Sequence, residues 1–184
     1  MIHAFLVLVV LAAPADTIPV PASAPDSVHS SASPGASARA PRSMVADSMV
    51  LDKSDRQLTL FYRGIQIYRY SVALGSNPVG DKIGRGDGRT PEGLFYIQSR
   101  NPRSKYHLSL RISYPDAAHR VRAASRGLTA GGDIMIHGLP PAFASIGGLH
   151  RQQDWTEGCI AVTNDEIEEI WRAVPNGARI LIRP

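Results

Sequence analysis

The chain has 184 residues, a single cysteine, and 20 Lys and Arg residues against 16 Asp and Glu residues. The formal net charge of +4 is scattered along the sequence, without a basic cluster interleaved with aromatic residues, so no nucleic-acid partner is expected. A mild positive charge suits a substrate that bears carboxylates, and a solvated surface explains it equally well. The length accommodates one compact domain of about 100–150 residues together with additional segments.

Residues 1–15 have the pattern of a signal peptide. Residues 4–13 read AFLVLVVLAA, and the small residues of Ala13-Pro14-Ala15 predict cleavage after Ala15. The apolar run is shorter than the about 20 residues that a membrane-spanning helix needs. We therefore expect export to the periplasm or cell envelope, with no membrane span after cleavage. The pattern departs from the usual one in that no Lys or Arg precedes the apolar run.

Residues 16–43 are predicted to form a flexible tether. Prolines at positions 19, 21, 25, 34 and 41 break helices and central strands, and most of the other residues are Ala, Ser or small polar residues. So few large apolar side chains cannot offset the entropy cost of ordering the segment. The folded domain is therefore expected to span residues 44–184.

Three short apolar segments open the predicted domain. Residues 45–52, 57–62 and 65–74 have strand length and are separated by turn-forming residues, which predicts an antiparallel meander. Residues 75–93 are rich in glycine and hold two prolines, so we expect a long ordered loop there.

The second part of the domain mixes strands with two helices. Residues 106–114 alternate between apolar and polar side chains, which predicts a strand with one face in the core. A helix is predicted to begin at Asn164, its expected N-cap, and to end before Pro175. The remaining expected elements are strands at residues 94–99, 134–136, 159–162 and 178–182, and a short helix within residues 115–126. Together they predict a mostly β domain with a helix near its C-terminal end packed on it.

Cys159 has no cysteine partner, so it is either a small buried residue or a reactive group. A cysteine nucleophile needs a neighbouring base, which is commonly histidine. His137 is the first candidate because it ends an apolar strand and precedes a glycine, and His150, in a loop, is the second. We assign His119 to a helix surface and His107 to the polar face of its strand. None of these spacings matches a CxxC or HExxH site, so no metal is expected.

Several runs together resemble the L,D-transpeptidase (YkuD-type) family, in its proteobacterial YafK- and ErfK-like branch. His137-Gly138 is followed 22 residues later by Cys159, within the run Thr156-Glu157-Gly158-Cys159-Ile160. The likeness covers most of residues 49–184. It includes the runs Leu51-Asp52-Lys53-Ser54, Gly80-Asp81-Lys82, Gly86-Asp87-Gly88-Arg89-Thr90-Pro91-Glu92-Gly93, Ile112-Ser113-Tyr114-Pro115 and Asp154-Trp155-Thr156.

The resemblance implies a β-sandwich catalytic domain that acts on peptidoglycan. By its motif, Cys159 is the nucleophile, His137 is the base, the carbonyl of Gly138 orients that base, and Gly158 helps to form the oxyanion-binding turn. Two positions depart from the family pattern. Many members have histidine where this chain has Glu157, and Arg or Asn where it has Ala161, so the acyl acceptor is left open.

Four further residues are expected to contact the substrate: His150, Trp155, Thr156 and Arg111. Trp155 is equally suited to packing against the turn, and Arg111, like Arg89, is either a carboxylate ligand or an ordinary surface arginine. The expected partners are peptidoglycan stem peptides and, in one version of the reaction, an envelope lipoprotein. No cofactor is expected.

The expected reaction is attack of Cys159 on the carbonyl at the L-centre of diaminopimelate, giving a thioester. An amine then takes the acyl group, either from a second diaminopimelate in a 3-3 crosslink or from a lipoprotein lysine. Water as the acceptor gives a hydrolytic L,D-carboxypeptidase or amidase instead. A non-catalytic cell-wall binding module is the rival from another class.

Overall fold

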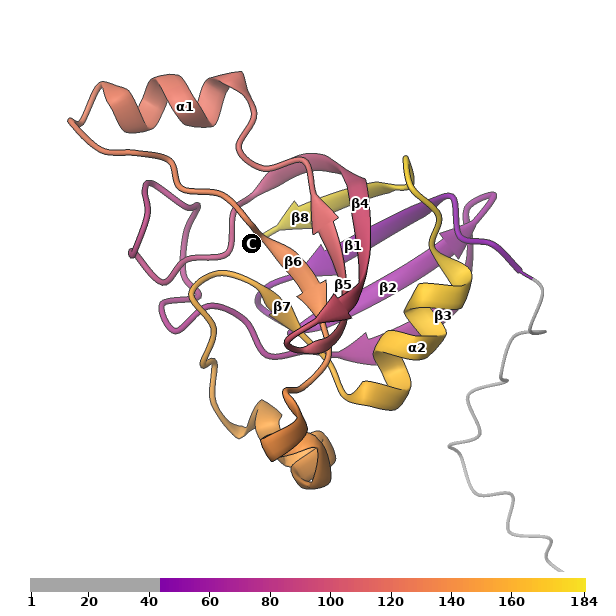
Figure 1. The fold of residues 1–184 in the computed structure, drawn as a ribbon. Coiled ribbons are helices and arrows are strands. Elements are labelled where there is room, and N and C mark those ends of the chain that lie inside the picture. The colour runs from indigo at the N-terminus through magenta and orange to yellow at the C-terminus, as the bar shows by residue number, and fades with distance from the viewer. Residues whose placement is uncertain (1–43) are drawn as a thin grey trace, which may run out of the picture. The chain divides into compact units, whose positions relative to one another are not determined.

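The structure, a computed structural model, describes residues 44–184, and the predicted signal peptide and tether lie outside them. Eight strands form one sheet in the order β3-β2-β1-β8-β4-β5-β6-β7 (Figure 1). The strands are β1 Ser48–Asp52, β2 Gln57–Tyr62, β3 Ile65–Ser71, β4 Gly93–Ser104, β5 His107–Ile112, β6 Met135–His137, β7 Ile160–Ala161 and β8 Arg179–Arg183. The helices are α1 Ala117–Ala124 and α2 Asn164–Ala173, and a 3₁₀ segment, η1, covers Pro141–Gln152.

The sheet curls until its two outer strands meet. The meander β1-β2-β3 is antiparallel, and the last strand, β8, returns to pair in parallel with β1. Strands β8, β4, β5 and β6 then continue antiparallel, and β7 pairs in parallel with β6. Ala73, just beyond β3, pairs with Ala161 of β7 through two backbone hydrogen bonds of 3.0 and 2.9 Å. The expected mostly β fold is therefore confirmed.

Apolar residues from all eight strands and α2 form one core inside this curl. Fully buried examples are Met49, Leu60, Phe95, Ile136 and Ile180. Helix α2 adds Ile167, Ile170 and Ala173, and it lies against the sheet as predicted (Figure 1). Burial of such a core is the main stabilising contribution to a domain of this size.

The predicted N-cap of α2 is wrong by one residue. Thr163 is the cap: its hydroxyl accepts from the N–H of Glu166, and the Glu166 carboxylate accepts from the N–H of Thr163. This reciprocal capping box satisfies two backbone donors at once, which a lone Asn cap does not do. The Asn164 side chain is therefore not used as the cap, and it accepts from the N–H of Leu139 instead.

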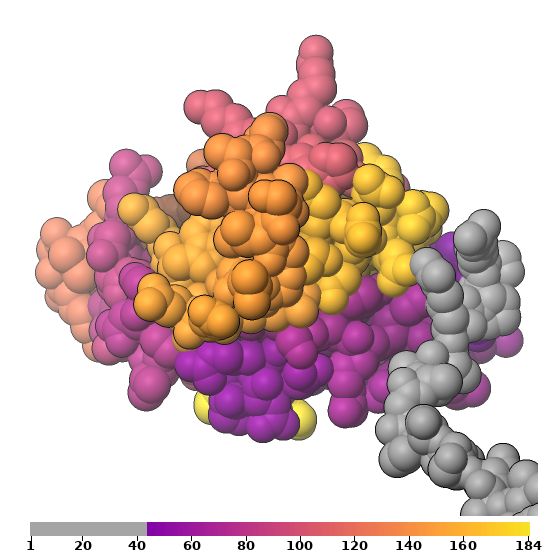
Figure 2. All heavy atoms as spheres, turned by 90° about the horizontal axis from the view of Figure 1, so that it is seen from below, coloured from indigo at the N-terminus to yellow at the C-terminus, as the bar shows by residue number. Residues whose placement is uncertain are grey.

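The segment before the cysteine and the surface of α1 also differ from expectation. The loop that carries His150 is the 3₁₀ segment η1, kinked at Gly147, whose φ of 50° lies in the left-handed region. This segment lies on the molecular surface (orange in Figure 2). His119 is buried rather than on a helix surface, with 6% of its area exposed. Its ring packs against Phe95 and Tyr114, and Nδ1 lies 2.7 Å from an Asp116 oxygen, so this side of the short helix α1 faces inward.

The alternation predicted for residues 106–114 holds only in part. Leu110, Ile112 and Tyr114 are buried, but so is Ser109, from the face expected to be polar. Tyr106 is 39% exposed because β5 begins one residue later, at His107, whose φ of 70° marks a turn. This turn removes Tyr106 from the core and places it beside the candidate site.

Candidate active site

Cys159 and His137 line one cavity of about 850 Å³. Strands β6 and β7 pair in parallel with Ile136 opposite Ile160, so Cys159 falls opposite Met135. Because side chains alternate along a strand, Cys159 and His137 lie on the same face of this strand pair. The parallel register thus brings together two residues that are 22 positions apart in sequence.

His137 is held in one tautomer. Its ring is 3% exposed, and Nδ1 lies 2.7 Å from the carbonyl oxygen of Gly138. A carbonyl can only accept, so Nδ1 carries the proton and Nε2 is free to accept one. Burial lowers the pKa of His137, and the bond to Gly138 opposes this. The imidazole is therefore neutral near pH 7 and has the form a general base requires.

Two aromatic rings confine the imidazole of His137. The Tyr106 ring centre lies 4.4 Å from that of His137, and the Trp155 ring meets it edge-on at 5.8 Å. Rings in these orientations attract one another and limit rotation of the imidazole. Tyr106 was not expected in the site, since its place at the apolar end of an alternating strand indicated a core residue.

Cys159 is partly exposed, and its Sγ lies 3.5 Å from the carbonyl oxygen of Asp133. Burial raises the pKa of the thiol, and the N–H of Met135 and the charge of Lys82 act in the opposite direction. With a raised thiol pKa and a lowered imidazole pKa, the resting pair is a neutral thiol beside a neutral imidazole.

The turn before Cys159 is built around Thr156. Its hydroxyl accepts from the N–H of Gly158 at 3.0 Å and donates to the carbonyl of Cys159 at 2.8 Å. Thr156 borders the cavity but is only 5% exposed, so its hydroxyl serves the turn. The Gly158 N–H is likewise used inside the turn and is not free for an oxyanion. Gly158 contributes its backbone instead: φ is 128°, and a Cβ would collide with the carbonyl oxygen of Arg89.

Gly138 and Asn164 join the histidine segment to helix α2. A Cβ on Gly138 would lie 2.5 Å from Asn164 Oδ1 and 2.8 Å from Ile167 Cγ2, so only glycine permits this approach. Asn164 Oδ1 accepts from the N–H of Leu139 at 2.7 Å. The start of α2 therefore fixes the chain immediately after His137.

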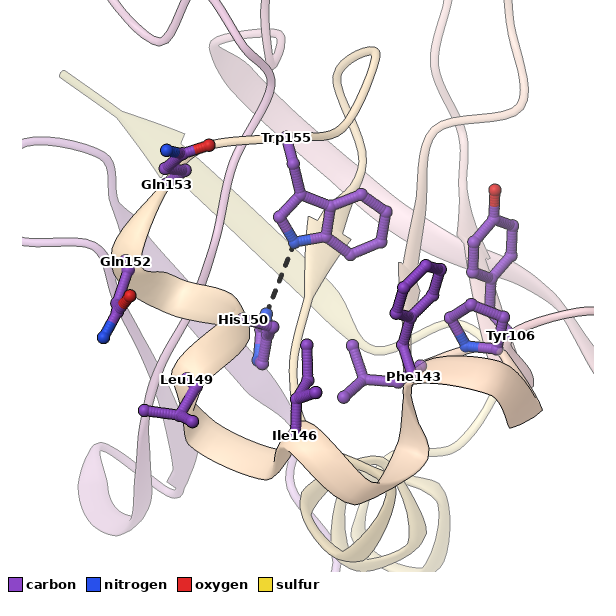
Figure 3. Close-up of a pocket in the computed structure, with 10 residues that line it drawn as sticks. Tyr106, Phe143, Ile146, Leu149, His150, Gln152, Gln153 and Trp155 are labelled. Atoms are coloured by element: carbon purple, nitrogen blue, oxygen red, sulfur yellow. Dashed lines mark hydrogen bonds between the residues drawn. The ribbon is translucent and has the colours of Figure 1, made fainter.

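His150 and Trp155 lie at a second cavity of about 510 Å³, which borders η1 (Figure 3). The indole N–H of Trp155 donates to Nδ1 of His150 at 3.4 Å. His150 is 6% exposed, and burial lowers its pKa to about 4. His150 thus supports Trp155 and does not border the cavity of Cys159 among the lining residues described.

Tyr106 and Trp155 border both cavities, which therefore share a wall. Residues of η1 line the second cavity on one side, where the apolar side chains of Phe143 and Ile146 project toward it (Figure 3). The Trp155 loop is anchored by Asp154, which accepts from the Arg56 guanidinium at 2.7 and 3.0 Å and from the N–H of Leu74 at 2.9 Å.

Arg111 borders the cavity of Cys159 and pairs with Asp133 at 3.1 Å; 42% of its side chain is exposed. Arg89 donates to the carbonyl of Asp81 instead, and its own carbonyl oxygen lies against Gly158. Two further cations border the cavity, Lys82 and Arg85, and neither was singled out from the sequence. The run Gly80-Asp81-Lys82 was the available signal for Lys82.

Residues 46–182 match the family model of the YkuD L,D-transpeptidase catalytic domain. The chain belongs to this family. It is 30% identical over 138 residues to "Putative L,D-transpeptidase YafK" of Escherichia coli strain K12, a match that covers 72% of this chain and 48% of the relative. The chain therefore spans about half the length of the curated relatives it matches.

Two solved structures support the fold. The helical cell shape determining protein Pgp2 from Campylobacter jejuni superposes with a TM-score of 0.59 at 24% identity, covering 77% of this chain and 48% of that one. Bdellovibrio bacteriovorus Bd1075 gives a TM-score of 0.54 at 24% identity, covering 78% and 49%. At these identities the likeness concerns the L,D-transpeptidase fold and not the substrate.

Residues 44–184 contain no helix with the length and apolar character needed to cross a bilayer. In the same part of the chain, no three His, Cys, Asp or Glu side chains are grouped as ligands for a metal ion.

Proposed function

We propose that the domain forms a thioester between Cys159 and a peptidoglycan stem peptide, at the L-centre of diaminopimelate. One observation carries this proposal: the only cysteine shares a cavity with a histidine whose tautomer leaves Nε2 free to take the thiol proton. Membership of the L,D-transpeptidase family supports the choice of substrate. A substrate in the cell wall agrees with the predicted signal peptide and an envelope location.

Acylation in this proposal exchanges one acyl bond for another. The thiol proton of Cys159 passes to Nε2 of His137, and Sγ attacks the carbonyl carbon that links diaminopimelate to D-alanine. The tetrahedral intermediate collapses when the C–N bond breaks, and the imidazolium returns the proton to the departing amine. D-Alanine leaves, and the carbonyl of Gly138 holds the imidazole ring in place throughout.

The charges of the cavity suit a zwitterionic peptide. Diaminopimelate carries both carboxylate and amino groups, and the cavity holds cations and anions: Lys82, Arg85, Arg111, Asp133 and Glu157. Arg111 is the cation we assign to a substrate carboxylate, because its guanidinium can make paired hydrogen bonds from a partly exposed position. Trp155 and Tyr106 would then contact the body of the peptide.

An amine completes the proposed transfer. His137 removes a proton from the incoming amine, which attacks the thioester and releases Sγ as the thiol. A diaminopimelate amine gives a 3-3 crosslink, and a lipoprotein lysine gives an anchored lipoprotein. Hydrolysis is the second candidate, and Glu157 favours it, because a carboxylate bordering the cavity can orient water as the acceptor.

Intact-mass measurement with a carbapenem tests the nucleophile. We expect one covalent adduct on the wild-type domain and none on Cys159→Ala. An unmodified wild type, or equal modification of Cys159→Ala, would refute the assignment and favour a binding module. Incubation with purified sacculi then separates the outcomes: new 3-3 dimers indicate transfer, whereas shortened stems or freed lipoprotein indicate hydrolysis.

A further inference from the structure

The glycine-rich loop of residues 75–93 is pinned by two buried lysines. Lys53 and Lys82 are each 3% exposed, and each uses its ammonium group in three contacts. Lys53 donates to the carbonyls of Gly80 and Thr90 and to the carboxylate of Glu92. Burying a charge is costly unless such partners surround it, so we ask what each buried lysine contributes to the loop.

Lys82 differs from Lys53 in what it touches. Its Nζ lies 2.7 Å from Asp87 Oδ1 and 3.3 Å from the carbonyl oxygens of both Arg89 and Glu157. The Arg89 carbonyl lies against the α-carbon of Gly158, and Glu157 immediately precedes that glycine. The Lys82 ammonium group therefore binds the Glu157 carbonyl, just before Gly158, and the Arg89 carbonyl, which packs against Gly158. Both contacts fix the backbone that precedes Cys159.

Asp87 fixes Lys82 in turn. Its carboxylate accepts from Lys82 and from the N–H groups of Ile83, Gly84 and Arg89. These bonds outweigh burial and lower the pKa of Asp87 to about 2, so the anion persists over the working pH range. A carboxylate with this many donors holds the lysine in one position.

Lys82 is also the buried cation of the catalytic cavity. Arg85 is exposed, and Arg111 is partly exposed and paired with Asp133. The anions Asp133 and Glu157 oppose ionisation of Cys159, and His137 is neutral at rest. A charge screened from water acts more strongly than one at the surface, so Lys82 is the cation of the cavity that, together with the N–H of Met135, acts to lower the pKa of the Cys159 thiol.

We propose that Lys82 is a positioning residue for the nucleophile: it holds the Glu157-Gly158 backbone and supplies a fixed positive charge that favours the Cys159 thiolate. The proton still passes between Sγ and His137, and Lys82 exchanges none. The inference rests on the proposed role of Cys159 as a nucleophile and is independent of the substrate.

Alkylation of Cys159 by iodoacetamide, followed across pH, tests this charge effect. The probe is unambiguous because the chain has one cysteine, and Cys159→Ala gives the background. Lys82→Gln keeps a hydrogen-bond donor and removes the charge. We expect its alkylation profile to move to higher pH, with a rate at neutral pH lower by roughly threefold, since a thiolate of higher pKa is scarcer but more nucleophilic.

Lys53→Gln is the matched control, since it removes an equally buried charge that contacts the same loop. We expect Lys53→Gln and Lys82→Arg to keep the wild-type profile. An unchanged profile in Lys82→Gln, or an equal shift in Lys53→Gln, would overturn the proposal. All rates are taken below the lowest melting temperature of the set.

If Lys82→Gln does not fold, Lys82→Arg carries the test, because a shifted profile despite a retained cation would refute the charge effect. Iodoacetamide needs no peptidoglycan. A negative result with sacculi would therefore reject the proposed substrate and leave the role of Lys82 standing.

Discussion

At the scale of single residues, the site depends on two histidines that are buried in their neutral form. His137 shares a cavity with Cys159, the proposed nucleophile, and is held in one tautomer, and His150 supports Trp155 on the wall between the cavities. Burial lowers the pKa of both side chains. A base with a lowered pKa remains available in mildly acidic surroundings, at the expense of a weaker pull on the thiol proton.

The neutral state of His150 predicts a loss of stability in acid. Its pKa is about 4 in the folded domain, whereas an unfolded chain protonates histidine near pH 6.5. As pH falls below that value the unfolded state binds the proton first, so the free energy of unfolding decreases down to about pH 4, by on the order of 3 kcal/mol. Urea denaturation at several pH values should therefore show a smaller decrease for His150→Gln than for the wild type.

The control for this measurement is His107→Gln. His107 is 39% exposed and pairs with Glu168 at the surface, so its loss should leave the decrease seen in the wild type nearly unchanged. Equal decreases in the wild type and His150→Gln would show that the acid sensitivity arises from other groups.

At the scale of elements, helix α2 does more than cover the core. Its capping box belongs to Thr163 and Glu166, which frees the Asn164 side chain to accept from the N–H of Leu139. Leu139 is 1% exposed, so that N–H has little access to water. The helix start therefore contributes a hydrogen bond to the segment that also carries the Gly138 carbonyl.

Asn164→Ala should lower both stability and the rate of acylation. The variant leaves the Leu139 N–H without its partner, at a cost of about 1–3 kcal/mol, and loosens the support of His137. Thr163→Ala is the matched control, because losing the cap costs a similar amount, about 1 kcal/mol, without touching Leu139. Thermal melts and carbapenem acylation rates compare the two. Equal acylation rates in the two variants would mean that Asn164 acts on stability alone.

At the scale of the whole molecule, the sequence was sufficient for local structure but not for distant contacts. Alternation and apolar runs predicted the strands, and the family motif placed Cys159 and His137 as candidates. The burial of His119 and the closure through Ala73 and Ala161 were not predicted, because each depends on which segments meet in the folded chain. The places of Tyr106 and Lys82 beside the cavity of Cys159 likewise depend on contacts between segments that are distant in sequence. The capping box is different: Thr163 and Glu166 are three residues apart, so the sequence carried its signature, and placing the N-cap at Asn164 overlooked it.

Asp154 shows such a long-range contact and yields the last prediction. Asp154 lies 98 residues from Arg56 in sequence, and it joins Arg56, between β1 and β2, and Leu74, beyond β3, to the loop of Trp155. Asp154→Ala leaves the buried Leu74 N–H unsatisfied and should cost about 1–3 kcal/mol or more, whereas Arg56→Ala loses only a partly exposed ion pair and should cost about 1 kcal/mol or less.

Urea denaturation gives the free energy of unfolding of each variant, and the rate of carbapenem acylation shows whether Trp155 keeps its place in the wall of the cavity. We expect Asp154→Ala to be slower in acylation than Arg56→Ala, because the Leu74 bond alone still holds the Trp155 loop when Arg56 is removed. If both variants lose the same free energy, the ion pair and not the backbone bond anchors the loop. If Asp154→Ala acylates at the wild-type rate, Trp155 keeps its place without that anchor, and the bond to His150 is sufficient to hold the shared wall.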